Sequence, residues 1–174
     1  NQSMNRPEDI REGVSASYAR AVEQNRPGGS CCAGPPPTTV LTTLAGYSRE
    51  ALQALPLDAV VNSFGCGNPL ALAELREGDT VLDLGSGAGI DLLLAAKLVG
   101  PRGKVIGVDM TEAMIQRARA NAAAAGLANV DVLEGIIEDL PVESDTIDFV
   151  VSNCVINLSP EKHRVFAEIH RVLK

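Results

Sequence analysis

The pattern of apolar and polar positions changes along the chain at Thr80. From there on, short apolar runs alternate with longer segments whose apolar residues recur at helical spacing. The runs that we expect to form strands are 81–84, 104–108, 130–133 and 147–152. The helical segments between them are 90–99 and 111–125, and Ser159–Pro160 begins a last helix. Alternating strands and helices, with strands apolar enough to be buried on both faces, predict an α/β fold with a doubly wound, mostly parallel sheet.

The part of the chain before Thr80 has a different pattern. In residues 7–24, the apolar side chains Ile10, Val14, Tyr18 and Val22 follow one another at four-residue spacing and predict a helix with one apolar stripe. Residues 25–37 are rich in Gly and Pro and predict a loop. Short helices are expected after the N-cap signals Ser48 and Asn68–Pro69. We therefore divide the chain into an N-terminal helix and loop (1–46) and an α/β domain (47–174).

The last predicted helix carries a set of apolar residues that we expect on one buried face: Val165, Phe166, Ile169, Val172 and Leu173. Both histidines of the chain, His163 and His170, lie on this helix, where a solvated or half-buried position is expected. The chain ends at Lys174 directly after this pattern, so we expect a fragment of a longer protein whose fourth strand is left at an unprotected edge of the sheet.

Composition and charge exclude some classes of partner. The 174 residues suffice for one compact domain, and with 3% aromatic residues and no Trp its core must consist of aliphatic side chains. The net charge of −7 repels phosphate backbones and anionic lipids, so neither nucleic acid nor membrane is an expected partner. No apolar run approaches the length of a membrane span, and no signal peptide is evident. We expect a cytoplasmic monomer that binds small molecules.

Residues 81–89, Val-Leu-Asp-Leu-Gly-Ser-Gly-Ala-Gly, join the first strand to the first helix of the α/β pattern. Glycines in such a turn let a ligand lie directly against the backbone. The dinucleotide fingerprint fails because Ile90 occupies its third glycine position, and the Gly-Lys-Ser/Thr ending of a phosphate loop is absent. Asp83 in the strand would repel a phosphate and attract an ammonium group, and Asp109 ends the next strand where an acid can accept ribose hydroxyls. An amino acid joined to a nucleoside, S-adenosylmethionine, fits both acids.

The four cysteines are Cys31, Cys32, Cys66 and Cys154. In a cytoplasmic protein we expect them to stay reduced, and their spacing matches no zinc motif. A lone cysteine is usually a small buried apolar residue. However, Cys66 stands between two glycines that cannot shield it, and Cys154 follows a strand at the edge of the sheet where such folds bind ligands.

Three strings carry a resemblance to known proteins: the glycine loop, Asn62-Ser-Phe-Gly-Cys-Gly-Asn-Pro69 and Ser152-Asn-Cys-Val-Ile-Asn-Leu158. The first resembles the class I S-adenosylmethionine-dependent methyltransferases, which have a Rossmann-like fold. The other two resemble the arsenite methyltransferases within that superfamily, although family members often have Tyr where Phe64 stands. The resemblance implies a set of cofactor-binding residues: Asp83, Gly85, Ser86, Gly87, Gly89, Asp109, Met110, Ile137, Glu138 and Asn153.

The resemblance also implies that Cys32, Cys66 and Cys154 bind trivalent arsenic as thiolates, with Cys31 as an alternative to Cys32. Arsenic is soft and prefers such ligands, and its lone pair can attack the methyl carbon without a general base. The implied reaction methylates arsenite and methylarsenite, with glutathione or thioredoxin as the thiol reductant. Two alternatives remain open: a methyltransferase of a small organic acceptor such as a quinone or polyketide, and a metalloid-binding fragment without activity.

Overall fold

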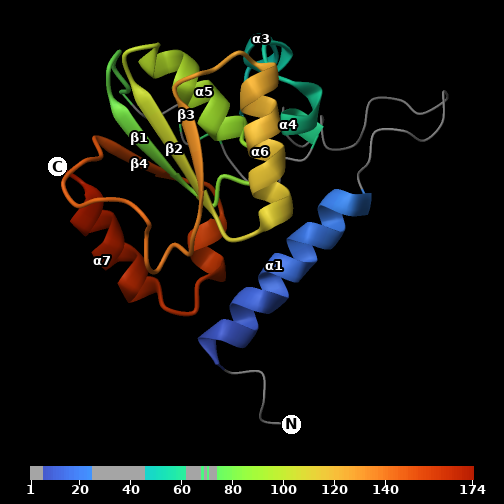
Figure 1. Ribbon diagram of the computed structural model, residues 1–174, viewed down its shortest axis with the longest axis vertical. Helices are drawn as coiled ribbons and strands as arrows, with labels where there is room; N and C mark the ends of the chain where they lie inside the picture. Colours follow the sequence, from blue (N-terminus) through green and yellow to red (C-terminus); the bar gives the residue numbers. More distant parts are fainter. Residues whose placement is uncertain (1–5, 25–45, 62–67, 69, 71–73) are drawn as a thin grey trace.

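The computed structural model describes residues 6–24, 46–61, 68, 70 and 74–174 of the chain. Its centre is a four-stranded parallel sheet in the order β3-β2-β1-β4 (Figure 1). The strands are β1 (Thr80–Leu84), β2 (Lys104–Asp109), β3 (Val130–Glu134) and β4 (Phe149–Ser152). The chain starts in the middle at β1, moves outward to β3, and then returns to place β4 on the other side of β1. This reversal confirms the predicted doubly wound topology and creates a crevice at the carboxyl ends of β1 and β4.

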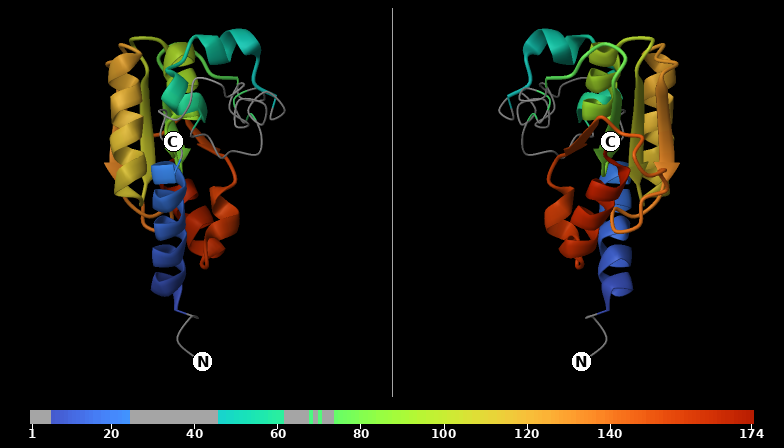
Figure 2. Two further views of the ribbon diagram at one scale, coloured as in Figure 1. Left: turned by 90° about the vertical axis from the view of Figure 1, so that its right-hand side faces the viewer. Right: turned by 90° about the vertical axis from the view of Figure 1, so that its left-hand side faces the viewer.

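Helices cover both faces of the sheet, as the edge-on views in Figure 2 show. Helices α5 (Ile90–Val99) and α6 (Glu112–Ala124) pack on one face, where Val81 and Val105 meet Leu92 and Ile115. Helix α7 (Lys162–Val172) covers the other face, and its Val165 and Val172 join Leu82, Leu84 and Val108 in a second core cluster. Alternate strand residues thus point to opposite faces, and both faces are apolar, as a buried parallel sheet requires.

The described residues before the sheet include the helices α1, α3 and α4. Helix α1 (Pro7–Gln24) contacts α6 and crosses the end of the sheet at which the strands stop (Figure 1). Helices α3 (Arg49–Gln53) and α4 (Leu57–Val61) pack beside α5 in a third apolar cluster that contains Tyr47. The Ser48 side chain accepts a hydrogen bond from Ala51 N and caps α3, as predicted.

The structure corrects the predicted α7 region. The helix begins at Lys162, because Val155–Leu158 first form a short 3-10 helix (η2) that the sequence did not indicate. Phe166 is 58% exposed, so the prediction of a buried position is wrong. The buried stripe is set by Val165 and Val172, which are seven residues apart, and Phe166 is rotated by about 100° from Val165. Ile10 of α1 is likewise exposed.

Strand β4 lies at the edge of the sheet among the described residues, as predicted. It begins at Phe149 rather than at Ile147, which instead forms an isolated parallel bridge with Leu173. Within the described ranges, no helix has the length and apolar character needed to span a membrane.

Candidate functional site

A cleft opens at the carboxyl ends of β1 and β2, where the glycine loop leaves the sheet and α5 begins. All ten residues predicted to bind the cofactor line this one cleft. They come from β1 and its loop, from the end of β2, from the segment after β3 and from the residue that follows β4. Helix α1 forms a further wall with Arg11, Val14 and Tyr18. Val14 and Tyr18 belong to its predicted apolar stripe, whereas no signal in the sequence indicated a role for Arg11.

The glycine loop is fixed by hydrogen bonds to the neighbouring strand. Gly85 N and Ser86 N both donate to Val108 O, at 2.8 and 3.2 Å. Gly87 has φ +53°, a left-handed conformation that favours glycine, and a methyl group added to it would meet no atom within 4 Å. The loop backbone is therefore held rigidly while its surface at Gly87 stays open toward the cleft.

Asp83 is the most unusual group in the cleft. Its side chain is 3% exposed, and the buried Oδ2 atom has no hydrogen-bond partner. Burial, followed by the negative charges of Asp91 and Asp109, raises the pKa of this carboxyl well above its usual range. A buried oxygen without a partner beside two further acids favours a ligand that carries a positive charge and hydrogen-bond donors at this point.

Asp109 at the end of β2 is held by the backbone around it. Its Oδ1 accepts from Thr111 N and its Oδ2 accepts from Gly87 N, both at 2.9 Å. Burial raises the pKa of Asp109, and these backbone hydrogen bonds oppose that effect. Each carboxylate oxygen keeps a lone pair that can accept a hydroxyl from the cleft.

Three polar side chains from different parts of the chain form a hydrogen-bonded triangle, in which Tyr47 and Asp91 are buried and Asn153 is half-buried. Tyr47 OH donates to Asp91 Oδ1 at 2.7 Å, and Asn153 Nδ2 lies 3.1 Å from Asp91 Oδ2 and 3.2 Å from Tyr47 OH. Burial raises the pKa of Asp91, whereas the hydrogen bonds from Tyr47 and Asn153 lower it. The predicted residue Asn153 is thereby fixed in place by two partners that sequence reasoning missed. Asp91 lies two residues after the glycine loop and could have been noticed, but nothing local marks Tyr47.

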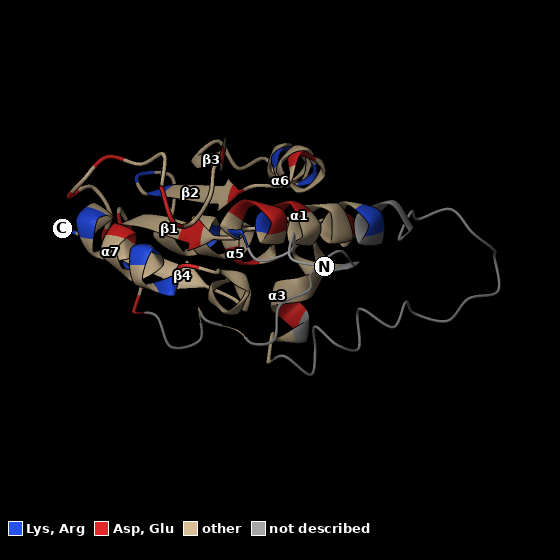
Figure 3. Cartoon of the chain, turned by 90° about the horizontal axis from the view of Figure 1, so that it is seen from below, with Lys and Arg blue, Asp and Glu red and all other residues tan. Residues whose placement is uncertain are grey.

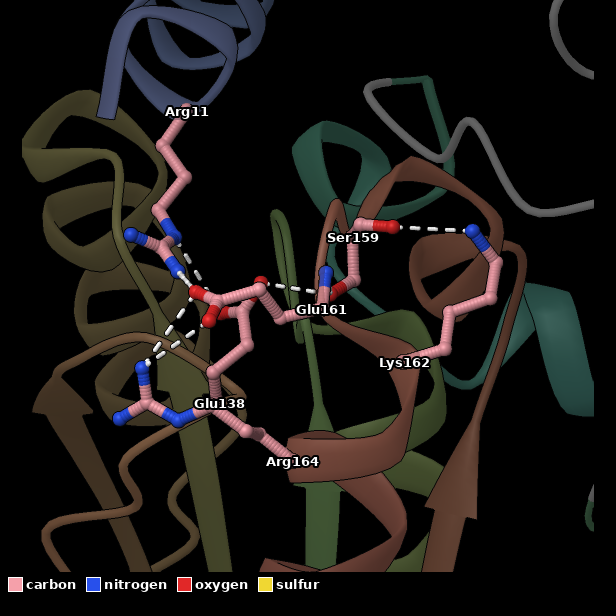
Figure 4. Close-up of polar contacts among 6 residues, drawn as sticks. All are labelled: Arg11, Glu138, Ser159, Glu161, Lys162 and Arg164. Atoms are coloured by element: carbon pink, nitrogen blue, oxygen red, sulfur yellow. Dashed lines mark hydrogen bonds and ion pairs between the residues drawn. The ribbon is translucent and has the colours of Figure 1, made fainter. Parts of the chain in front are cut away.

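Glu138 lies in the cleft wall with its carboxylate engaged by the protein (Figure 4). The Ser159 hydroxyl donates to Glu138 Oε1 at 2.6 Å, and the guanidinium of Arg11 lies 3.5 Å from Oε2. The neighbouring Asp139 is exposed. Glu138 thus lines the cleft and also pairs with Arg11 of α1.

Cys154 follows Asn153 and precedes η2 with φ +65°, a left-handed backbone that few residues other than Gly and Asn adopt. Its sulfur lies 3.5 Å from Asn153 Oδ1. The structure has Cys154 in a disulfide, contrary to the expectation of four reduced thiols, and the other cysteine lies outside the described residues. The predicted ligands Cys32 and Cys66, and the alternative Cys31, also lie outside the described ranges. Among the described residues, no group of three His, Cys, Asp or Glu side chains could hold a metal ion.

A parallel sheet with this strand order, a glycine loop at its switch point and acids at the carboxyl ends of β1 and β2 define a methyltransferase-like α/β domain. In agreement, residues 75–174 match the family described as a methyltransferase domain, and the chain belongs to that family. The family implies S-adenosylmethionine as the methyl donor. Two observations of this structure fit that molecule: the buried oxygen of Asp83 without a partner, which suits a cationic ligand, and the open surface above Gly87.

Known relatives are similar to the chain over most of its length. An arsenite methyltransferase of Halobacterium salinarum is 42% identical and covers 97% of this chain and 45% of the relative. The crystal structure of an arsenic (III) S-adenosylmethionine methyltransferase from Chlamydomonas reinhardtii is 42% identical, with a TM-score of 0.59, over 80% of this chain and 46% of that one. A demethylmenaquinone methyltransferase of Symbiobacterium thermophilum is 38% identical over 60% of this chain and 42% of its own. The chain thus spans less than half the length of these relatives.

Proposed function

We propose that this chain is the cofactor-binding part of an arsenite methyltransferase, which transfers a methyl group from S-adenosylmethionine to thiolate-bound trivalent arsenic. The observation that carries the proposal is the position of Cys154. It directly follows Asn153, a residue of the cleft wall, at the switch point between β1 and β4. The similarity to arsenite methyltransferases over nearly the whole chain supports the same conclusion.

The cofactor supplies an electrophilic methyl group on a positively charged sulfur, and the residues of the cleft hold and orient it. In this proposal Asp83 binds the ammonium group and Asp109 accepts the ribose hydroxyls, and the position of both residues in the cleft supports these roles. The backbone of the glycine loop gives the ligand a close, rigid surface at Gly87. Holding two reactants in place in this way can contribute roughly 7–11 kcal/mol to a transfer reaction.

On the acceptor side, we propose Cys32, Cys66 and Cys154 as the arsenic ligands, with Cys31 as the alternative to Cys32. A cysteine in a disulfide cannot bind arsenic as a thiolate, so the disulfide of Cys154 must be reduced first. This requirement supports glutathione or thioredoxin as a co-substrate, and it favours the reducing cytoplasm as the compartment.

Native mass spectrometry of the reduced protein with arsenite, with and without S-adenosylhomocysteine, tests the proposal. We expect one arsenic atom to bind with the loss of three thiol protons. Cys154→Ser and Cys66→Ser should each abolish this adduct, because two thiolates hold arsenic more weakly than three. In a longer chain with turnover, Cys154→Ser should also abolish arsenic methylation. Retained methylation in that variant would disprove the assigned role of Cys154.

The similarity to a demethylmenaquinone methyltransferase favours a second candidate, a methyltransferase of a small organic acceptor. It would use the same cofactor cleft without needing three thiols. S-adenosylhomocysteine binding without any arsenic adduct would support this candidate over the first.

A further inference from the structure

Helix α1 lies against the cofactor cleft although it is more than 60 residues away from the glycine loop in the sequence. Val14 and Tyr18 present apolar surface to the cleft beside Met110 and Met114. The hydroxyl groups of Ser15 and Thr111 form a hydrogen bond of 3.1 Å, which joins α1 to the start of α6. One side of α1 is thus attached to the wall formed by β2 and α6.

The same helix is attached to the opposite wall by the side chain of Arg11 (Figure 4). Its Nη2 donates to Glu161 Oε2 at 2.6 Å, and its Nε lies 3.5 Å from Glu138 Oε2. The Arg11 side chain is 16% exposed and that of Glu138 only 3% exposed. A partly buried, charge-assisted contact of this kind is stronger than a surface ion pair.

Arg11 and its partners come from different elements. Glu138 belongs to the segment after β3, and Glu161 immediately precedes α7. Among the described residues, Arg11 is the one Lys or Arg within 4 Å of the Glu138 carboxylate, whereas Glu161 is also paired with Arg164 of α7. Basic and acidic residues occur on both α1 and α7 at this end of the molecule (Figure 3). Losing Arg11 would leave Glu138 buried without a cationic partner and α1 without its second attachment.

We propose that α1 is the cover of the cofactor cleft and that Arg11 is the positioning residue that holds it closed, by bridging to Glu138 and Glu161 across the opening. The inference rests on the cofactor part of the proposed function and is independent of the arsenic part. A nucleoside-bearing ligand enclosed between the glycine loop and α1 leaves when this bridge opens. Arg11 therefore controls the rate of cofactor exchange.

Surface plasmon resonance with S-adenosylhomocysteine tests the proposal on the variants Arg11→Gln and Arg164→Gln. Both variants remove one cation from Glu161, but Arg164 lies on α7 and does not line the cleft. Arg11→Gln should raise the dissociation rate about 10- to 100-fold, the range expected for one charge-assisted hydrogen bond. Arg164→Gln should stay within about twofold of the unchanged protein. Added salt should speed dissociation from the unchanged protein more than from Arg11→Gln.

Equal dissociation rates in all three proteins, or equal acceleration in both variants, would overturn the proposal. If Arg11→Gln does not fold, hydrogen exchange of the unchanged protein tests the proposal instead. S-adenosylhomocysteine should slow the exchange of the α1 amides. If it does not, the proposal that α1 covers the cleft is wrong. Failure of the unchanged protein to bind S-adenosylhomocysteine would instead refute the proposed cofactor. Binding of S-adenosylhomocysteine without binding of arsenite would refute only the proposed acceptor and leave the test of α1 intact.

Discussion

At the scale of single residues, three carboxyl groups characterise the cleft: those of Asp83 and Asp91 are buried, and that of Asp109 is half-buried. Burial raises the pKa of each of them. Asp91 and Asp109 are compensated by several hydrogen bonds, but Asp83 keeps an oxygen without a partner. The ionised form of Asp83 therefore costs folding free energy, which a bound cation would recover.

Asp83→Asn should make the ligand-free protein more stable at neutral pH, by about 1 kcal/mol, and should abolish S-adenosylhomocysteine binding. Because the pKa of Asp83 is higher in the folded than in the unfolded state, the folded state binds more protons. The free energy of unfolding must then fall as the pH rises from the ordinary range of an aspartate through the raised pKa. Urea unfolding at a series of pH values should show this decrease in the free energy of unfolding. The decrease should be smaller in Asp83→Asn.

Asp148→Asn is the matched control, because we expect it to change the free energy of unfolding in the opposite direction. Hydrogen bonds from Lys174 and Thr80 N lower the pKa of Asp148, so its contribution to stability is present at neutral pH and lost as the pH falls. This variant should be less stable than the unchanged protein at neutral pH. If both substitutions changed stability in the same direction, the interpretation of Asp83 as a strained functional acid would be wrong.

Two glycines of the loop should respond differently to alanine. A methyl group on Gly85, where φ is +67°, would lie 2.6 Å from a methyl carbon of Val155, so Gly85→Ala should cost about 2–4 kcal/mol. Gly87→Ala meets no neighbour and should cost only about 1 kcal/mol of backbone strain. It should nevertheless weaken S-adenosylhomocysteine binding, because the methyl group occupies cleft space. Urea unfolding and calorimetric titration measure the two effects, and full affinity in Gly87→Ala would exclude close contact there.

At the scale of elements, the sequence predicted every strand of the sheet and the helices α3, α5, α6 and α7, but neither α4 nor η2. Helix α5 was predicted with its observed bounds, because Gly89 and Gly100 flank its apolar residues. The start of α7 was misplaced because Ser159–Pro160 resembles a helix start, whereas the Ser159 hydroxyl is used instead by Glu138. The short helix η2 has no periodic signal, since four residues are too few to show one.

The segment that carries Ile137 and Glu138 into the cleft is fastened to α7 by Arg171. This guanidinium donates two hydrogen bonds to the Glu168 carboxylate, at 2.6 and 2.7 Å, and further ones to the carbonyl oxygens of Leu140 and Val142. A lysine cannot make this set of hydrogen bonds, so Arg171→Lys should lower the free energy of unfolding by about 1 kcal/mol. Arg102→Lys, in an exposed pair with Glu77, should have almost no effect. If urea unfolding showed the same loss of stability for Arg171→Lys and Arg102→Lys, Arg171 would contribute no more than an exposed ion pair.

At the scale of the whole molecule, the cleft residues that could be predicted are those placed by the α/β topology. Strand ends meet at one edge of a parallel sheet, so Asp83, Asp109 and Asn153 could be expected together from their order alone. Arg11 and Tyr47 could not be expected there, because their positions depend on how the N-terminal segment packs against elements more than 40 residues away. The cysteine ligand set remains a prediction, because three of its four candidates lie outside the described residues.

The acidic cleft also has a consequence for the protons that are taken up when a ligand binds. At neutral pH S-adenosylmethionine carries one net positive charge, and S-adenosylhomocysteine, which lacks the methyl group, carries none. The carboxyl groups with raised pKa must therefore hold more protons beside the demethylated ligand than beside the donor. Calorimetric titrations in buffers of different ionisation enthalpy should show a larger proton uptake for S-adenosylhomocysteine, and equal uptake would contradict this reasoning. Since proton uptake becomes costly in alkali, a rising pH should weaken the binding of S-adenosylhomocysteine more than that of S-adenosylmethionine.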